Sequence, residues 1–208
     1  QEENIDILFV GSSHCYRSLD PRITDEMFGA NTFNVGSSAQ ELDGSLALIR
    51  ETAKTNDLEQ IYLEVYYDIA QMPAFEDREA LVSTYIISDY MRPSLNKLGY
   101  LLKASSMEHY SNSFIPARRN WDKLFMKDYV ANVIKSKTAE WYKDYTYPFG
   151  EAERYEGKGY VAVDLVGDIY YGYEHFEPID TVAISEDYVD TLNEIIAFCE
   201  KEDIELTL

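Results

Sequence analysis

Two serines directly follow a short apolar segment, where a serine could act as a nucleophile. The segment Ile5–Val10 is followed by Gly11, Ser12, Ser13 and His14. A serine at the point where a buried strand turns into a helix presents its hydroxyl at the sheet edge, and nearby backbone N–H groups can stabilise an oxyanion. Small residues also follow strands for steric reasons alone. The pattern therefore indicates either a catalytic serine or a simple tight turn.

A nucleophilic serine needs a base, and the chain has three histidines. His14 adjoins the serines, but adjacent side chains in a tight turn diverge, so a packing or hydrogen-bonding role is favoured. His175 could reach the serines only if its loop folds back over the strand ends, and we expect His109 to be exposed. No histidine has a partner at helical spacing, and Cys15 and Cys199 lie far apart. The sequence therefore indicates two buried thiols, and it implies neither a metal site nor a cofactor.

Other polar side chains could contribute to such a site. Glu64 and Asp68 lie where a third apolar segment ends, and a carboxylate there could orient a base or bind a sugar hydroxyl. A helix cap or an ion pair with an arginine is the favoured alternative. Arg118 and Arg119 could meet an anionic polymer or form an internal salt bridge. Several tyrosines could stack on a carbohydrate, although packing is their commoner role. These are Tyr142, Tyr145, Tyr147, Tyr155 and Tyr160.

The elements that position these residues alternate between strands and helices. Apolar runs predict strands at 5–10, 32–35 and 61–65. Helical patterns fall between them, at 20–28 with Asp20 as N-cap, Pro21 at the first position and Gly29 as the stop, and at 42–53. This β-α-β-α-β order predicts a parallel sheet with right-handed crossovers, which carries its site at the carboxyl ends of its strands.

The rest of the chain is predicted to be mainly helical. Helical patterns at 78–90, 94–102 and 121–142 indicate a helical insertion over the sheet at about 73–150. Residues 145–175 suit irregular structure or a small hairpin around 159–163. A last helix at 187–201 leads into what resembles the start of another parallel strand at 204–208. We therefore expect a single domain over 1–208.

Composition limits the partners. The 208 residues have a net charge of −20, so nucleic-acid binding and a basic membrane-surface role are disfavoured. The hydrophobic content of 46% is typical of a folded protein, and no apolar run approaches the roughly 18 residues of a spanning helix. The sequence begins with Gln1, so any leader or anchor would lie upstream of it.

The turn after the first strand resembles the first block of the SGNH/GDSL hydrolase superfamily, a strand followed by Gly-Asp-Ser-Leu with serine as the nucleophile. Gly11-Ser12-Ser13-His14 occupies those four places. The resemblance therefore implies Ser13 as the nucleophile and its N–H as an oxyanion donor. The second block resembles Asn-x-x-x-x-Gly, and counting from Asn34 places Ala39 at the glycine. Alanine can keep the donor role if its backbone avoids a left-handed conformation.

Two further blocks of the family depart from its pattern. The third, Gly-x-Asn-Asp, is matched by V-Y-Y-D, which keeps only Asp68, and the side-chain amide of Gln40 could substitute for the missing asparagine. The fourth, an Asp-x-x-His that supplies the base, is absent from the sequence. The resemblance thus implies that the domain continues beyond Leu208 and takes its base from there. We expect the site to be supported by Ser12, His14, Gly36, Gln40 and Asp68.

The blocks look like those of a bacterial cell-envelope subgroup, related to the D-alanine transfer protein and to glycan O-acetyltransferases. The resemblance implies an α/β fold, a three-layer flavodoxin-like parallel sheet with helices on both faces. It also implies an extracytoplasmic location with an upstream membrane anchor. The expected function is serine acyl-ester hydrolysis or O-acyl transfer on an acylated glycan or small ester. The alternative is a non-catalytic module of the same fold that binds a glycan or a protein. The sequence gives no oligomeric state.

Overall fold

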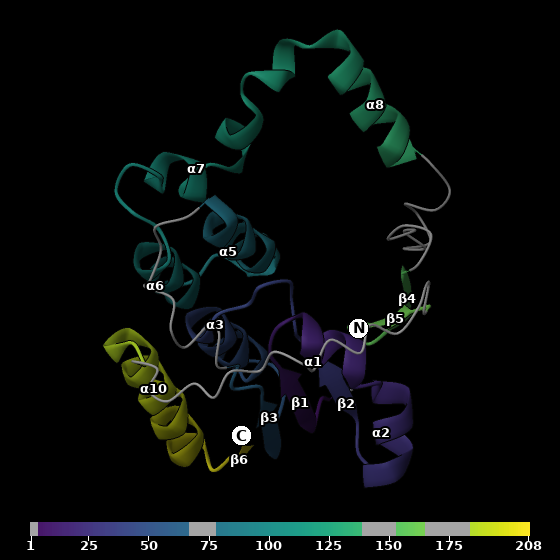
Figure 1. The fold of residues 1–208 in the computed structure, drawn as a ribbon, viewed down its shortest axis with the longest axis vertical. Coiled ribbons are helices and arrows are strands. Elements are labelled where there is room, and N and C mark those ends of the chain that lie inside the picture. Colours follow the sequence, from purple (N-terminus) through teal and green to yellow (C-terminus); the bar gives the residue numbers. More distant parts are fainter. Residues whose placement is uncertain (1–3, 67–77, 139–152, 165–183) are drawn as a thin grey trace, which may run out of the picture.

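A four-stranded parallel sheet forms the centre of the molecule (Figure 1). The computed structural model describes residues 4–66, 78–138, 153–164 and 184–208. The strands are β1 (Ile7–Val10), β2 (Thr32–Asn34), β3 (Gln60–Leu63) and β6 (Glu205–Thr207), in the order β2-β1-β3-β6. Every pairing between them is parallel, which confirms the α/β class and the parallel sheet predicted from the sequence.

The strand register brings the candidate site residues to one edge of the sheet. Val10 is level with Leu63, so Gly11 and Glu64 follow at the same height. The ladder continues for one more bond there, because the N–H of Glu64 donates to the carbonyl of Val10 at 2.9 Å. All four residues of β1 are buried, as expected for a central strand covered on both faces.

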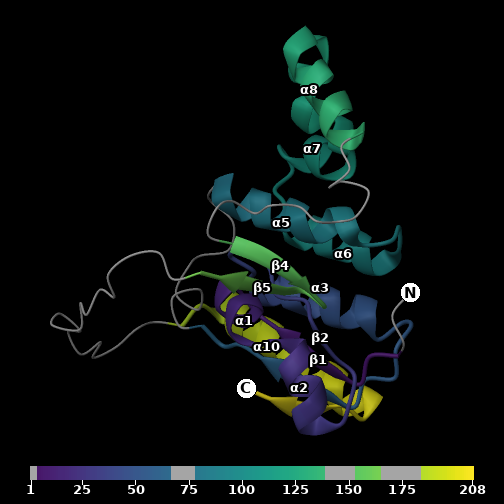
Figure 2. The same cartoon turned by 90° about the vertical axis from the view of Figure 1, so that its right-hand side faces the viewer.

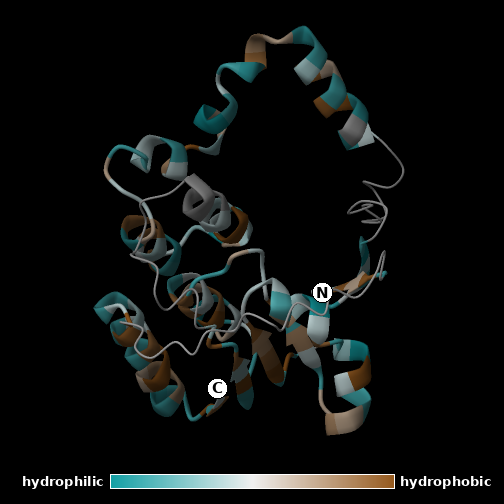
Figure 3. Ribbon diagram, in the orientation of Figure 1, coloured by the Kyte–Doolittle hydropathy of each residue, from teal (hydrophilic) through white to brown (hydrophobic). Residues whose placement is uncertain are grey.

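Helices cover both faces of the sheet. On one face lie α3 (Leu42–Thr52) and α10 (Glu186–Glu202), and on the other α1 (Ser13–Ser18) and α2 (Pro21–Phe28). Leu8 and Ile61 point into the first layer, whereas Ile7 and Phe9 point into the second. Hydrophobic residues are accordingly concentrated in the strands (Figure 3).

The ends of α2 follow the sequence signals. The Asp20 side chain accepts the N–H of Arg22 at 3.0 Å, Pro21 opens the helix, and Gly29 closes it with a φ of 66°. Arg22 also holds the pKa of Asp20 below its usual value through a side-chain hydrogen bond. These caps satisfy helix ends that would otherwise be left without partners.

Residues 78–138 are helical where the insertion was expected, although the last helix begins at Lys127, later than predicted. The segment contains the helices α5 (Arg78–Tyr90), α6 (Leu95–Lys103), α7 (Tyr110–Phe114) and α8 (Lys127–Thr138). Two 3₁₀ turns lie between α7 and α8, namely η1 (Pro116–Asn120) and η2 (Lys123–Phe125). The segment packs on Ala47 of α3 through Ile87 of α5, Tyr100 of α6 and Ala104, the residue that follows α6. The description of 1–208 as one domain with an insertion stays a prediction.

A small hairpin lies against the edge strand β2. It consists of β4 (Glu153–Gly157) and β5 (Tyr160–Val163), as predicted around 159–163. Asn34 donates its N–H to the carbonyl of Lys158 at 3.0 Å, and Gly159 has a φ of 81°. A Cβ at Gly159 would lie 1.8 Å from the carbonyl oxygen of Asn34. The close approach of hairpin and sheet therefore requires glycine there.

Figure 2 shows the helical segment rising from the sheet, with α5 and α6 nearest to it and α8 farthest away. Within the described ranges, no helix is both long and apolar enough to cross a membrane.

Candidate functional site

Ser12 and Glu64 form the centre of a polar cluster at the carboxyl edge of the sheet. Glu64 accepts the N–H of Ser12 at 2.6 Å, and its two carboxylate oxygens each lie 3.0 Å from Ser12 Oγ. Ser12 also caps α1, because its Oγ accepts the N–H of His14 at 3.4 Å. With only 4% of its surface exposed, Ser12 holds the turn in place and is poorly placed to meet a substrate.

His14 completes this cluster from the solvent side. Its Nδ1 lies 3.0 Å from Glu64 Oε1 and 3.2 Å from Ser12 Oγ, and its ring stands edge-on to Tyr66. A carboxylate only accepts hydrogen bonds, so Nδ1 carries the proton in this contact and Nε2 keeps the lone pair in the neutral ring. The His14 side chain is 60% exposed. His14 therefore has the hydrogen-bonding role that the sequence favoured.

Gly11 allows Glu64 to approach the turn this closely. A Cβ at Gly11 would lie 2.4 Å from Glu64 Oε2 and 2.5 Å from Glu64 Cβ. Any side chain there would displace the carboxylate from Ser12. The sequence favoured a helix cap or an arginine partner for Glu64, whereas in the structure Ser12 caps α1 and Glu64 contacts Ser12 and His14. The signal for this role was a carboxylate directly after a buried strand, level with a glycine.

Ser13, the expected nucleophile, is the first residue of α1 and is partly exposed. Neither its hydroxyl nor its N–H makes a hydrogen bond with another residue in the described ranges. An N–H in the first turn of a helix has no partner within the helix. Ser13 therefore offers both a hydroxyl and a donor to an incoming group, whereas Ser12 offers neither.

The loop after β2 differs in conformation from the arrangement expected of it. Ala39 has a φ of 51°, so its backbone is in the left-handed conformation that the donor role was required to avoid. The N–H of Gly36 already donates to Asn34 Oδ1 at 2.9 Å. Gln40 is buried, and its amide nitrogen donates to Ser45 Oγ at 3.1 Å while its oxygen accepts from Ser37 at 2.9 Å. These groups stabilise the loop itself.

Asn34 connects this loop to the serine turn, a role that sequence analysis missed. Its side-chain NH₂ donates to the carbonyls of Cys15 at 3.0 Å and Leu19 at 3.3 Å, while its oxygen accepts from Gly36. The side chain is fully buried. A buried amide with bonds on both sides fixes α1 against β2. A polar residue inside an otherwise apolar strand was the available signal.

Two hollows lie beside the cluster. A groove of about 300 Å³ is lined by His14, Cys15, Tyr62 and Glu64 together with the chain end at Thr207 and Leu208. A smaller cavity of about 10 Å³ lies between Ser12, Gln40, Glu64 and Tyr188. The Tyr188 hydroxyl is buried without a partner among the described residues. Burial, then the Glu64 charge, raises the pKa of Tyr188. The larger hollow can hold a substrate group, whereas the smaller has room for about one water.

Cys15 lies beneath the serine turn but is unsuited to nucleophilic chemistry. Burial and the charge of Glu64 raise the pKa of its thiol to about 12. The thiolate is the reactive form, so this cysteine is inert near neutral pH. Cys199 is also buried, and the two are free thiols, as the sequence indicated.

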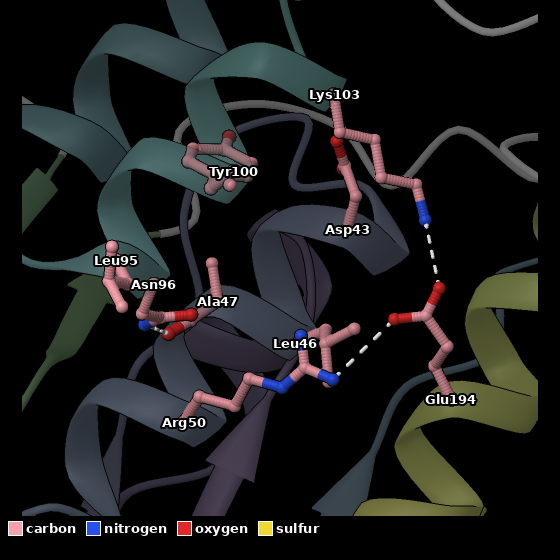
Figure 4. Close-up of a pocket in the computed structure, with 10 residues that line it drawn as sticks. Asp43, Leu46, Ala47, Arg50, Leu95, Asn96, Tyr100, Lys103 and Glu194 are labelled. Atoms are coloured by element: carbon pink, nitrogen blue, oxygen red, sulfur yellow. Dashed lines mark hydrogen bonds and ion pairs between the residues drawn. The ribbon is translucent and has the colours of Figure 1, made fainter.

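A third hollow lies where the helical segment meets α3 and α10 (Figure 4). It has a volume of about 250 Å³, and Arg50 and Lys103 approach Glu194 across it at 3.5 and 3.6 Å. Burial raises the pKa of Asp43 to about 6, although the hydrogen bond from the N–H of Gly44 lowers it in part. Burial and the neighbouring Asp43 raise that of Glu41 to about 7. Glu41 and Asp43 follow closely after the second predicted block, but neither was anticipated as part of a site.

The remaining predicted residues are dispersed or lie outside the described ranges. Arg119 forms an ion pair with Asp89 at 2.6 Å, and His109 is partly exposed beside Glu108. Tyr155 and Tyr160 belong to the hairpin and are not gathered at the sheet edge. The following lie outside the described residues: Asp68, Tyr142, Tyr145, Tyr147 and His175. In the part of the chain that is described, no group of His, Cys, Asp and Glu is arranged to hold a metal ion.

Comparisons of the chain with protein-family models, with curated proteins and with solved structures gave no significant match.

Proposed function

We propose that the chain carries the nucleophile of a serine acyl-ester hydrolase or O-acyltransferase, and that its substrate is an acylated glycan or a related small ester. The observation that carries the proposal is the position of Ser13. Its hydroxyl and N–H are both uncommitted among the described residues, next to the Ser12–His14–Glu64 cluster at the carboxyl edge of a parallel sheet. Sites of parallel α/β sheets lie at this edge.

In the proposed reaction Ser13 Oγ attacks the acyl carbon and the ester alcohol leaves. The N–H of Ser13 would donate to the developing oxyanion. Water releases the acid in hydrolysis, whereas a sugar hydroxyl takes up the acyl group in transfer. Glu64 and His14 hold the turn that presents Ser13. We assign the proton acceptor to a group outside the described residues, either His175 or the Asp-x-x-His that the resemblance implies.

The finer fold assignment belongs to the same proposal. The order β2-β1-β3-β6 with helices on both faces supports a flavodoxin-like arrangement, in which the second strand lies outside the first. The family resemblance also carries the proposed extracytoplasmic location and the upstream membrane anchor.

A binding module on the same fold is the second candidate, and the loop after β2 favours it. The left-handed backbone at Ala39 departs from the conformation expected of the second oxyanion donor, and the nearby N–H of Gly36 already donates to Asn34. Removing one such donor typically costs about 100- to 1000-fold in kcat. A site with a single donor could still hold a glycan without cleaving its ester.

A fluorophosphonate probe separates the two candidates. Such a probe labels an activated serine covalently, so the intact protein is treated with it and the labelled residue is identified by mass spectrometry. We expect labelling at Ser13, loss of labelling in Ser13→Ala, and loss of esterase activity toward an acetylated glycan in the same variant.

The matched control is Ser18→Ala, which removes an exposed hydroxyl at the other end of α1. It should keep full labelling. A folded Ser13→Ala protein that retains esterase activity would exclude the enzyme proposal. An intact protein that is never labelled but binds the acylated glycan would favour the binding module.

A further inference from the structure

The helical arm, which we define as residues 115–138, has a charge opposite to that of the rest of the chain. It contains six Lys and Arg and two Asp, a net charge of +4. The whole chain has −20, which leaves −24 for the remaining residues. The total charge therefore hides a basic segment.

Most cations of the arm are free of ion pairs. Arg118, Lys123, Lys127 and Lys135 form no salt bridge with any residue in the described ranges. Arg119, by contrast, pairs with Asp89 of α5 at 2.6 Å and lies 3.6 Å from the Tyr85 ring centroid. One arginine thus attaches the start of the arm, while Arg118, Lys123, Lys127 and Lys135 remain available to a partner.

Large apolar side chains are exposed beside these cations. Trp121 is 60% exposed, Phe125 77% and Ile134 59%. The rings of Trp121 and Phe125 are in edge-to-face contact with centroids 6.1 Å apart. Leu124 in η2 and Met126 just before α8 are exposed as well. A contiguous set of exposed aromatic and aliphatic side chains marks an interaction surface.

The arm stands away from the acidic part of the molecule. Figures 1 and 2 both show α8 at the far end from the sheet, and in Figure 2 α7, α5 and α6 lie between them. One intervening helix already separates them by about 10 Å. The Debye length at 0.1 M salt is also about 10 Å, so repulsion of the acidic remainder is largely screened where the arm makes contact.

We propose that the arm binds the surface of a lipid bilayer that contains anionic lipids. Trp121 and Phe125 enter the headgroup region, and Lys123 and Lys127 contact lipid phosphates. The exposed aliphatic side chains favour lipid over an anionic polysaccharide, because sugars stack on aromatic faces and gain little from leucine or methionine. The net charge of the chain disfavoured a membrane-surface role, and that expectation then applies to the remainder of the chain and not to the arm.

Co-sedimentation with lipid vesicles tests this proposal on the full chain. We expect binding to vesicles of phosphatidylcholine that contain roughly 30% phosphatidylglycerol, a composition close to that of an acidic leaflet. We expect little binding to vesicles of phosphatidylcholine alone. Lys123→Gln and Lys127→Gln should each weaken binding about fivefold. Trp121→Ser should weaken it further. In a Trp141→Phe background, Trp121 emission should shift to shorter wavelength when anionic vesicles are added.

The matched controls remove similar side chains elsewhere. Lys201→Gln takes an exposed lysine from α10, and Tyr90→Ser takes an exposed aromatic residue from the end of α5. Both should bind vesicles like the unchanged protein. Equal binding to neutral vesicles, or equal loss in the control variants, would overturn the proposal. Binding of a soluble polyuronate with no vesicle binding would assign the arm to a polysaccharide. Arm variants that change only the oligomeric state in sedimentation velocity would assign it to self-association.

Discussion

The sheet-end cluster and the helical arm hold their polar side chains in opposite ways. At the sheet end, Ser12 and Asn34 are buried and each makes several hydrogen bonds to groups on neighbouring elements. In the arm, Lys127 and Lys135 are exposed and unpaired with described residues. One region fixes geometry, whereas the other presents charge.

The difference matches what the proposed role of each region requires. A reaction requires a serine held in a defined place, and the cluster uses buried bonds to hold it. Adsorption to a surface requires exposed charge and apolar area, but no fixed geometry. Substitutions should therefore be costly to folding at the sheet end and nearly neutral to folding in the arm.

The same change in both regions gives the largest expected contrast. Asn34→Ala removes a buried amide, leaves the Leu19 carbonyl and the N–H of Gly36 without partners, and takes one of two hydrogen bonds from the Cys15 carbonyl, so we expect a loss of about 3 kcal/mol. Asn132→Ala, on the exposed surface of α8, should change stability by less than about 0.5 kcal/mol, because alanine favours helix. Urea unfolding of both variants measures this, and similar losses would refute the contrast.

A pair of glycine substitutions tests the close approach of Glu64. Gly11→Ala places a Cβ 2.4 Å from Glu64 Oε2, and the expected loss is about 2 kcal/mol together with loss of probe labelling at Ser13. Gly99→Ala is the matched control, because a Cβ there meets nothing within 4 Å in the middle of α6. It should stabilise the protein by about 0.5 kcal/mol. Tolerance of alanine at position 11 would show that Glu64 does not need this approach.

The regular elements could be predicted from the sequence because local signals determine them. The Asp20-Pro21 start and the Gly29 stop specify α2, and alternating apolar runs specify the parallel strands. The helix expected at 121–142 was predicted too early in the chain, since residues 116–125 form 3₁₀ turns before α8 begins at Lys127. Aromatic and apolar residues continue through those turns, so their pattern gave no boundary.

The candidate site was only partly predictable. Ser13 was placed from its neighbours along the chain, because a turn after a strand is a local feature. The role of Glu64 depends on strand register, and that of Asn34 depends on two carbonyl partners from distant residues, Cys15 and Leu19. The backbone of Ala39 is set by the turn from Ser37 to Gln40. Such features arise from tertiary contacts that one sequence does not display.

The acidic residues at the start of α3 give a pH-dependent test where α6 packs against the sheet layer. The folded-state pKa values of Asp43 and Glu41 are raised to about 6 and about 7 from 3.8 and 4.5. The folded state therefore binds more protons than the unfolded state between these values, and stability falls as pH rises. We expect a loss on the order of 2 kcal/mol between pH 5 and pH 8 from this pair.

Asp43→Asn keeps an acceptor for the N–H of Gly44 while removing the charge. Urea unfolding at pH 5 and pH 8 should then show a smaller difference than in the unchanged protein. Asp122→Asn, in the exposed arm, should leave the difference as it is. An Asp43→Asn protein with an unaltered pH dependence would show that these carboxyls do not control it.

The smallest expected effect is that of Tyr188→Phe beside the cluster. The Tyr188 hydroxyl is buried and lacks a partner among the described residues, so its removal should change the free energy of unfolding by less than about 0.5 kcal/mol. Tyr100→Phe is the control, because its hydroxyl bonds to Thr84 and its loss should cost about 1 kcal/mol. If Tyr188→Phe proved the costlier of the two in urea unfolding, the hydroxyl would have a partner, and a water in the cavity shared with Ser12 and Glu64 is the group that fits there.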